Sequence, residues 1–284
     1  MRTLLCVVVL CVLVGGAYGE DASVIPEKNV RLSQNQSFGF TEDTHYEPLV
    51  GSGVGAEYAP SYWLNMQLLW NPIFKINPDI RGGSLYFGLK NYIMGSGALV
   101  DTAQWLRLSA ALGILIPPPE KNPDLRDQDQ NLWGSSLRLY SDFVFSKYFY
   151  INLYFEGVFY PPQYVDNDVF YGDWAHHYLD LTGELEAHFE IPLNNGVVLK
   201  GGAPVRFFYA PYMNADDEYA DSQYLLSAGG YFGVSLPAYH PPVEIYLRYN
   251  ANIRGLNTKQ VHQVSVISRV TLPPEALKLR LKKN

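Results

Sequence analysis

The chain has 284 residues, a formal net charge of −7, a mean hydropathy of −0.08 and 22 tyrosines. The acidic balance argues against nucleic acid as a partner, because a phosphate backbone is bound by clustered lysine and arginine. Both cysteines, Cys6 and Cys11, lie in the first eleven residues, so a disulfide framework and a thiolate metal site are excluded for the rest of the chain. The length suits a single domain.

Residues 1–19 have the pattern of a secretory signal peptide. Arg2 supplies a positive charge, residues 4–14 are apolar, and Ala17-Tyr18-Gly19 is a small-x-small cleavage sequence. A transmembrane anchor is the alternative, but it needs about 20 apolar residues. We expect cleavage after Gly19, which removes one base and no acid and lowers the formal charge from −7 to −8.

Residues 20–60 are punctuated by glycine and proline and are predicted as a periplasmic lead-in. Downstream of them, ten segments show the period-two alternation of half-buried β-strands. In chain order they are 61–71, 83–93, 104–115, 133–145, 149–160, 179–191, 197–209, 224–236, 243–253 and 260–272. Pro204, inside the seventh segment, predicts a bulge or an exposed N–H there.

The segment 179–191 is the most regular of the ten. Apolar or small residues occupy its odd positions and polar residues its even positions, without a break over thirteen residues. A strand places successive side chains on opposite faces, whereas a helix would spread Asp180, Glu184 and Glu190 around its circumference. Strands of soluble sandwiches usually have about 5 to 6 residues, and membrane-crossing strands need about 9 to 11. The length of this run therefore favours a bilayer-spanning strand.

The connections between these segments alternate in length. Long polar connections follow the first, third, fifth and seventh segments, whereas short ones follow the fourth, sixth and eighth. Outer-membrane barrels have short periplasmic turns and long outer loops. The pattern predicts an all-β fold, a transmembrane antiparallel up-and-down β-barrel of about ten strands, with eight to twelve possible, spanning residues 61–272.

Aromatic residues recur near the ends of the predicted strands, where an interfacial girdle would lie. They are Trp70, Trp105, Trp133, Tyr148, Phe149, Phe159, Tyr160, Trp174, Tyr178 and residues 207–209. A soluble two-sheet β-sandwich could instead bury these rings in its core, and that alternative stays open at this point.

If the apolar faces meet lipid, the opposite faces line the lumen. Strand parity then predicts a lumen-lining charge network in which seven bases balance seven acids, with His188 among them. Its members are Lys90, Arg107, Arg138, Asp142, Glu156, Asp180, Glu184, Glu186, His188, Glu190, Lys200, Arg206, Glu244, Arg248 and Arg269. Pairing is expected because an isolated charge is costly in a confined interior. Hairpin folding predicts Arg138 close to opposite Glu156, and His188 near Lys200.

A barrel of about ten strands is narrow, and its interior tends to fill with side chains. The balanced network is therefore compatible with a small pore and with a closed barrel that serves as a scaffold or adhesin. Both readings stay open.

Catalytic and metal-binding residues are weakly indicated. Asp173, His176 and His177 precede the sixth segment, and the acids of 216–218 lie in the next long connection. Adjacent histidines point to opposite faces of a strand, and loop acids commonly serve solubility, so no enzyme, cofactor or metal site is predicted.

The chain from 61 to 272 resembles Gram-negative-type outer-membrane β-barrel proteins in its signal, strand rhythm, girdle and turns. The segment Trp105-Leu-Arg-Leu-Ser-Ala-Ala-Leu-Gly-Ile-Leu-Ile-Pro-Pro looks like the strand-then-proline segments of hydrophobic-compound transporter and phenol-degradation barrels. These resemblances imply passive passage of small molecules, including apolar ones. Such barrels commonly end in an aromatic residue, whereas the tenth segment ends at Leu272 and a basic tail, 273–284, follows it.

The sequence therefore predicts a monomer in the cell outer membrane, in contact with its lipid, that passes small solutes. A closed barrel acting through its outer loops and a secreted soluble β-sandwich binding module are the alternative functions.

Overall fold

The computed structural model describes residues 22, 25–41, 48–75, 81–94, 105–116, 133–159, 179–193, 196–210, 223–238, 240–256 and 261–274. The predicted signal peptide, most of the basic tail and the long connections lie outside these residues. No helix among them is long and apolar enough to cross a membrane.

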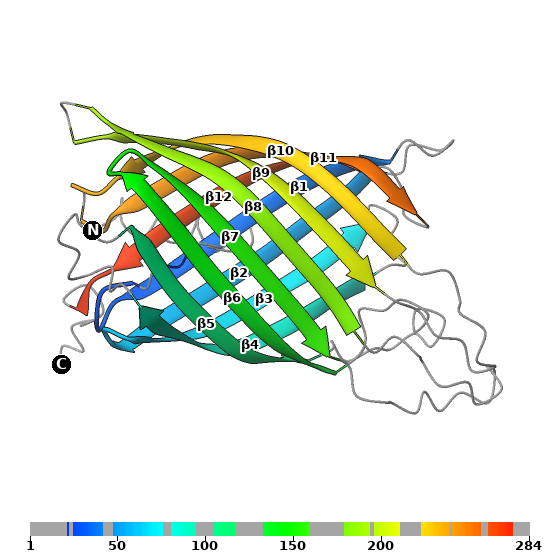
Figure 1. The fold of residues 1–284 in the computed structure, drawn as a ribbon, viewed down its shortest axis with the longest axis horizontal. Coiled ribbons are helices and arrows are strands. Elements are labelled where there is room, and N and C mark those ends of the chain that lie inside the picture. Colours follow the sequence, from blue (N-terminus) through cyan, green and yellow to red (C-terminus); the bar gives the residue numbers. More distant parts are fainter. Residues whose placement is uncertain are drawn as a thin grey trace, which may run out of the picture.

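Twelve antiparallel strands form a closed barrel in which each strand pairs with its neighbours in sequence (Figure 1). The barrel closes where β1 pairs with β12, from Val30 opposite Leu272 to Thr41 opposite Val261. The strands are β1 Val30–Thr41, β2 Pro48–Ser61, β3 Leu64–Lys75, β4 Arg81–Met94, β5 Leu106–Ile116, β6 Gly134–Ser146, β7 Phe149–Phe159, β8 Leu179–Pro192, β9 Val198–Ala210, β10 Gln223–Leu236, β11 Val243–Leu256 and β12 Val261–Leu272.

The predicted fold class is confirmed, with the strand count at the upper limit of the predicted range. The ten segments predicted from alternation correspond to β3 through β12. The two additional strands, β1 and β2, lie between Val30 and Ser61 and so take up most of residues 20–60. The barrel therefore begins at Val30, and the prediction of a lead-in throughout 20–60 was wrong.

The alternation of β1 and β2 is weak for an identifiable reason. In β1, Gln34 and Gln36 occupy the parity of the exposed Phe38, so both of its faces contain polar residues. In β2, glycines such as Gly51 and Gly55 occupy odd-numbered positions. The hydroxyls of β1 serines pack closely against these glycines. A pattern of large apolar against charged residues is therefore missing from both strands.

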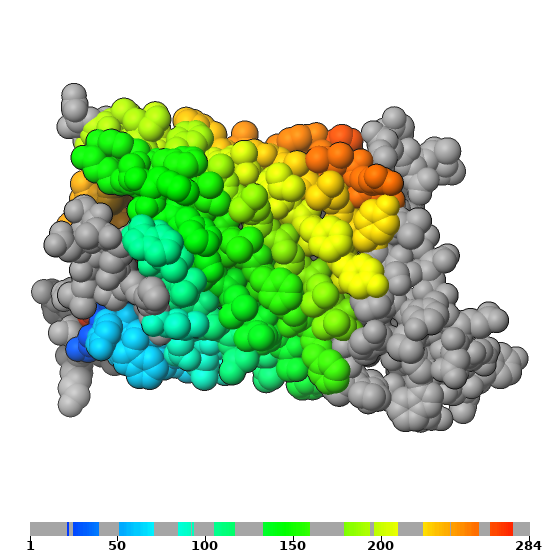
Figure 2. Space-filling view, in the orientation of Figure 1, coloured from blue at the N-terminus to red at the C-terminus, as the bar shows by residue number. Residues whose placement is uncertain are grey.

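The outer face of the barrel is apolar along its middle. Leu112, Leu137, Leu153, Leu185 and Phe232, on five different strands, are between 44% and 67% exposed. Figure 2 shows the outward side chains of β6 to β10 as a continuous face between the two ends. Apolar surface of this extent is unfavourable in water and suits contact with lipid chains.

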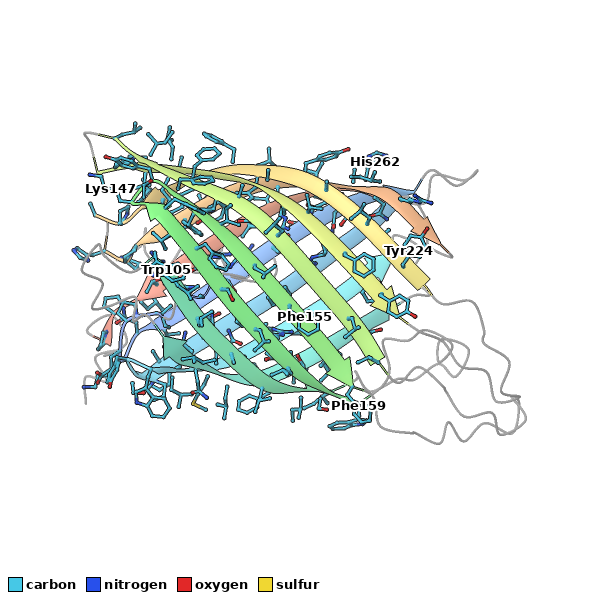
Figure 3. All side chains as sticks on the ribbon, in the orientation of Figure 1. Trp105, Lys147, Phe155, Phe159, Tyr224 and His262 are labelled. Carbon is cyan, nitrogen blue, oxygen red and sulfur yellow. The ribbon has the colours of Figure 1, made fainter. Side chains whose placement is uncertain are left out.

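Exposed aromatic rings lie at both ends of this face. Trp105 lies at the end that carries the β6–β7 turn with Lys147, and Phe159 and Tyr224 lie at the other end (Figure 3). Trp70, Trp133, Tyr148, Phe149 and Phe207 are exposed as well. Tyr160, Trp174 and Tyr178 of the predicted girdle lie outside the described residues.

The described turns between strands lie at one end of the barrel. They join β2 to β3, β6 to β7, β8 to β9 and β10 to β11, and β1 begins and β12 ends there too (Figure 1). Because each strand runs opposite to the one before it, an even number of strands brings the end of β12 to the same end of the barrel as the start of β1. This end is called the turn end, and the opposite one the loop end.

Pro204 interrupts one ladder without bending it. Between β9 and β10 the pairing stops at Val205 opposite Ala228 and resumes at Gly202 opposite Tyr231, in the same register. Proline has no N–H to donate, so two rungs are missing. The predicted bulge is absent from this pair, and a gap of two rungs in an unshifted register is found instead.

Glycines in the wall make room for a lumenal tyrosine. The ring of Tyr86 lies over Gly88 and Gly113, which are opposite each other on β4 and β5. A Cβ at Gly113 would meet the ring carbons of Tyr86 at 2.3 Å. The Tyr86 ring cannot easily move away from the glycines, because the guanidinium of Arg138 lies 3.7 Å from the ring centroid.

This packing predicts that Gly113→Ala lowers the free energy of unfolding by about 1 to 3 kcal/mol, the usual cost of overpacking. Gly183→Ala is the matched control, since a Cβ at Gly183 meets nothing within 4 Å. Urea unfolding in detergent micelles, followed by tryptophan fluorescence, measures both. Equal stability of the two variants would contradict the packing argument.

Candidate functional site

The lumen of the barrel collects the ionisable side chains of the strands. All fifteen residues of the predicted charge network lie in β4 to β12, on the parity opposite the exposed apolar side chains. Strand register then decides which of them meet. Ion pairs join residues directly opposite each other, among them Arg107 with Asp142, Arg138 with Glu156, Glu184 with Arg206, Glu190 with Lys200, and Glu244 with Arg269.

The wall formed by β4 to β7 is tightly packed. The Nε of Arg138 donates to Glu156 at 2.7 Å, and Ser136 and Tyr154 donate to the same carboxylate at 2.8 Å and 2.6 Å. The side chain of Arg138 is only 3% exposed. On the same wall, the Nζ of Lys90 lies 4.1 Å from the centroid of the Tyr140 ring. These groups hold one another and exclude water.

Asp142 connects this wall to the start of the described chain. Its carboxylate accepts from Asn152 at 2.8 Å and lies 3.7 Å from the guanidinium of Arg107. The backbone N–H of Ala22 donates to both carboxylate oxygens, at 3.1 Å and 3.3 Å. Ala22 is fully buried in a cluster with Ala111, Tyr140 and Tyr154. The segment before β1 therefore reaches across the lumen, from β1 to the wall at β5 to β7.

Glu184 is shared by two arginines on the other side of the lumen. The Nε of Arg206 donates to it at 2.7 Å, and an Nη of Arg248 donates at 3.1 Å. The carboxylate is fully buried, whereas the side chain of Arg206 is 38% exposed. One acid thus holds two bases in place, and one of the bases keeps contact with solvent.

A chain of ion pairs follows nearer the turn end. Lys200 lies 3.0 Å from Glu190 and 2.8 Å from Glu244, and Glu244 lies 3.7 Å from Arg269. Tyr246 donates to Glu244 at 2.8 Å. The carboxylate of Glu190 is 31% exposed, so this chain is also in contact with solvent.

His188 lies between carboxylates. Its Nε2 is 3.2 Å from Glu190, and its Nδ1 contacts the hydroxyl of Tyr231, which donates to Glu186 at 2.6 Å. The register places His188 opposite Gly202 and Glu190 opposite Lys200. The register is two residues from the one that folding about 192–196 predicts, because β9 starts at Val198. His188 and Lys200 both contact Glu190, which lies between them.

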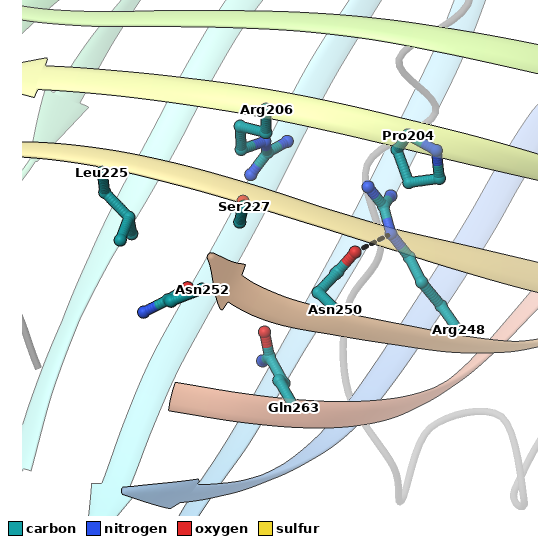
Figure 4. A pocket seen from close by; sticks show the side chains of 8 residues that line it. All are labelled: Pro204, Arg206, Leu225, Ser227, Arg248, Asn250, Asn252 and Gln263. Carbon is teal, nitrogen blue, oxygen red and sulfur yellow. Dashed lines mark hydrogen bonds between the residues drawn. The ribbon is translucent and has the colours of Figure 1, made fainter. Parts of the chain in front are cut away.

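The lumen is consequently asymmetric. Most ionic side chains on β4 to β7 are packed, although Arg107 is 23% exposed, whereas Arg206 on β9 and Glu190 on β8 are 38% and 31% exposed. A cavity of about 160 Å³ opens on the second side, in the half nearer the loop end (Figure 4). Its lining residues come from β9, β10, β11 and β12: Pro204, Arg206, Leu225, Ser227, Arg248, Asn250, Asn252 and Gln263.

Two charged groups of the lumen are absent from the sequence-based set. Arg31 on β1 lies 3.8 Å from Glu57 on β2, and Glu57 also accepts from Gln67 at 3.2 Å. Arg31 and Glu57 were not predicted as lumenal residues because β1 and β2 were not predicted as strands. They add one base and one acid, so the balance of charge is kept. Asp180 is half-buried near the start of β8.

The weak catalytic and metal candidates, Asp173, His176, His177 and residues 216–218, lie outside the described residues. Within the described part of the chain, no three histidine, aspartate or glutamate side chains gather as they would around a metal ion.

Comparison with known proteins shows the fold. No protein-family model and no curated protein matches the chain. An outer-membrane channel from Pseudomonas putida superimposes with a TM-score of 0.66 at 10% identity, covering 90% of this chain and 100% of that one. The β domain of the Bordetella autotransporter Brka gives 0.50 at 10% identity, covering 85% and 98%. A monoaromatic hydrocarbon channel, CymD, gives only 0.38 at 10% identity, covering 88% and 89%.

The likeness to the first two structures, at these identities, is a likeness of fold. The chain has the architecture of outer-membrane β-barrels.

The packed wall yields a prediction for Glu156→Ala. The change leaves the buried Arg138 without its ion-pair partner and is expected to cost about 3 kcal/mol of unfolding free energy. Glu27→Gln is the control, because Glu27 pairs with Lys28 on the surface and exposed pairs contribute little. Urea unfolding of both variants is the measurement, and a Glu156→Ala variant as stable as the control would contradict the prediction.

Proposed function

We propose that the protein is a narrow passive pore of the outer membrane that passes small polar solutes. The observation that carries this is the solvent contact of the ionic side chains on β8 to β12, with Arg206 as the most exposed of the pairs. Eight-stranded barrels have interiors about filled by side chains, and channels of 16 to 18 strands are open. Twelve strands lie between, which leaves room for water along one wall.

The polarity of the lumen bears on the class of solute. Ion pairs, carboxamides and hydroxyls line the exposed part of the lumen, with Leu225 and Pro204 beside them, and an apolar molecule would leave these polar groups without water. Polar solutes are therefore favoured over the apolar ones that the sequence resemblance suggested. Passage through such a lumen breaks no bond, so the proposal involves neither an enzyme activity nor a cofactor.

A second candidate function is supported by the contact of Ala22 with Asp142. A segment that crosses the lumen fills part of its cross-section, as a closed barrel acting through its outer loops would require. Single-channel recording decides between the two candidate functions.

Purified folded protein inserted into a planar bilayer in potassium chloride is expected to give discrete single-channel steps. Heat-modifiable mobility on a gel confirms that the sample is folded. Folded protein that gives no step would contradict the pore and support the closed barrel.

The lumenal contact of Ala22 yields a further prediction. Deleting residues 20–25, which leaves β1 intact, removes the group bound by Asp142 and is expected to increase the single-channel conductance. Asp142→Ala should change the conductance in the same direction, because it removes the acceptor. Unchanged step size in both folded variants would show that the segment does not narrow the pore.

A further inference from the structure

We infer that His188 holds a proton inside the lumen as an imidazolium ion, and that release of this proton makes the pore more selective for cations. The control of selectivity rests on the proposed pore function. The protonation state of the ring can be measured without any ion flow, so the proton site and the pore can fail separately.

The hydrogen bonds around His188 require a hydrogen on each ring nitrogen. An ionised carboxylate can only accept, so the Nε2 that lies 3.2 Å from an oxygen of Glu190 is the donor in that contact. The hydroxyl of Tyr231 has a single hydrogen, which it donates to Glu186 at 2.6 Å. The Nδ1 that contacts the same hydroxyl oxygen must therefore donate as well. A histidine that donates from both nitrogens carries a positive charge.

Two carboxylates on the same face of β8 flank the ring. The Nε2 of His188 lies 3.2 Å from Glu190, and its Nδ1 lies 3.6 Å from Glu186. The side chain of His188 is only 7% exposed, and opposite charges at such distances attract each other more strongly away from bulk water. The charged ring therefore links two acids that would otherwise repel each other.

The strands on both sides of β8 add a tyrosine and a lysine to these surroundings. On β7, Tyr150 is directly opposite His188, with 4.2 Å between the ring centroids. On β9 the residue opposite His188 is Gly202, which has no side chain. Lys200, also on β9, lies 3.0 Å from Glu190 and so contacts the same carboxylate as the ring.

The next strands, β10 and β11, supply two tyrosines and one acid. The ring of Tyr231 lies 5.7 Å from that of His188, and Tyr246 meets Tyr231 edge-on at 5.8 Å. Tyr246 donates to Glu244, which is 2.8 Å from Lys200. Among these residue types, only histidine ordinarily changes its charge between about pH 5 and 8. We therefore expect His188 to be the member of this group that titrates near neutral pH.

Loss of the proton changes the lumen in two ways. The charge at this place falls by one unit, whatever the charges of the other lumenal groups are. A neutral imidazole has one N–H, so it can no longer donate on both sides, and one of the two carboxylates loses its link to the ring. The side chain of Glu190 is 31% exposed, so the added negative potential reaches the water in the lumen. A more negative lumen favours potassium over chloride.

Nitrogen NMR of the detergent-solubilised full chain, labelled with ¹⁵N-histidine, tests the protonation state. The chain has six histidines, and the signals missing from the spectrum of His188→Gln identify those of His188. We expect a hydrogen on both ring nitrogens of His188 at pH 6 and on one of them at pH 9. A single ring hydrogen at pH 6, or two at pH 9, would overturn the proton site.

Single-channel recording under a potassium chloride gradient tests the control of selectivity. Between pH 6 and pH 9 the permeability ratio of potassium to chloride is expected to rise about twofold or more, because one charge changes beside a narrow path. His188→Gln should remove most of this rise. His240→Gln, which replaces an exposed histidine between β10 and β11, is the matched control and should keep it.

A rise of the same size in His188→Gln, or an equal loss of the rise in His240→Gln, would overturn the control of selectivity by His188. Conductance with no change of selectivity between the two pH values would overturn it too and leave the pore. Titration of His188 in a folded chain that gives no conductance would support the proton site while contradicting the pore.

Discussion

The pairing of β1 with β12 is the constraint on which the rest of the structure depends. An unpaired backbone N–H or C=O in hydrocarbon costs several kcal/mol, so a sheet can cross a bilayer only when it closes on itself. Twelve consecutive residue pairs, from Val30 with Leu272 to Thr41 with Val261, make that closure. Closure also fixes two faces, because alternating side chains must then point either to lipid or to the lumen.

The side chains of the barrel wall do not fill the whole of the resulting lumen. On the wall of β4 to β7 the space is taken up by rings stacked on glycines, by buried ion pairs and by the segment that brings Ala22 to Asp142. On the wall of β8 to β12 the acids are shared between bases, as Glu184 is between Arg206 and Arg248, and the bases keep contact with water. This asymmetry places the packed side chains on one side of the barrel and the side chains in contact with solvent on the other.

Much of this was predictable from the sequence, for reasons that differ between elements. Strand β8 was predicted nearly to its observed bounds because Leu179 to Ile191 alternates without a break. The pairing of Arg138 with Glu156 followed from a two-residue turn, whereas a longer turn shifted His188 away from Lys200. Strands β1 and β2 were missed because small and polar residues blur their two faces.

The candidate site was predictable in its members but not in its form. The alternation along β9 and β11 predicts that the side chains of Arg206 and Arg248 face the lumen. The cavity, however, depends on how four strands twist past one another. The contact of Ala22 with Asp142 joins residues 120 positions apart, and no local sequence pattern predicts it. Tyrosines such as Tyr86 were left out because only a structure shows that a ring can lie flat over two glycines.

The central claim is that water reaches one wall of the lumen and not the other, and cysteine labelling tests it most directly. With Cys6 and Cys11 replaced by alanine, Ser227→Cys on β10 and Ser109→Cys on β5 are each exposed to a small, membrane-impermeant thiol reagent in lipid vesicles. Ser109 is 1% exposed and Ser227 is half-buried at the cavity. We expect rapid labelling at Ser227→Cys and protection at Ser109→Cys. Protection of both positions, or equal labelling of both, would contradict it.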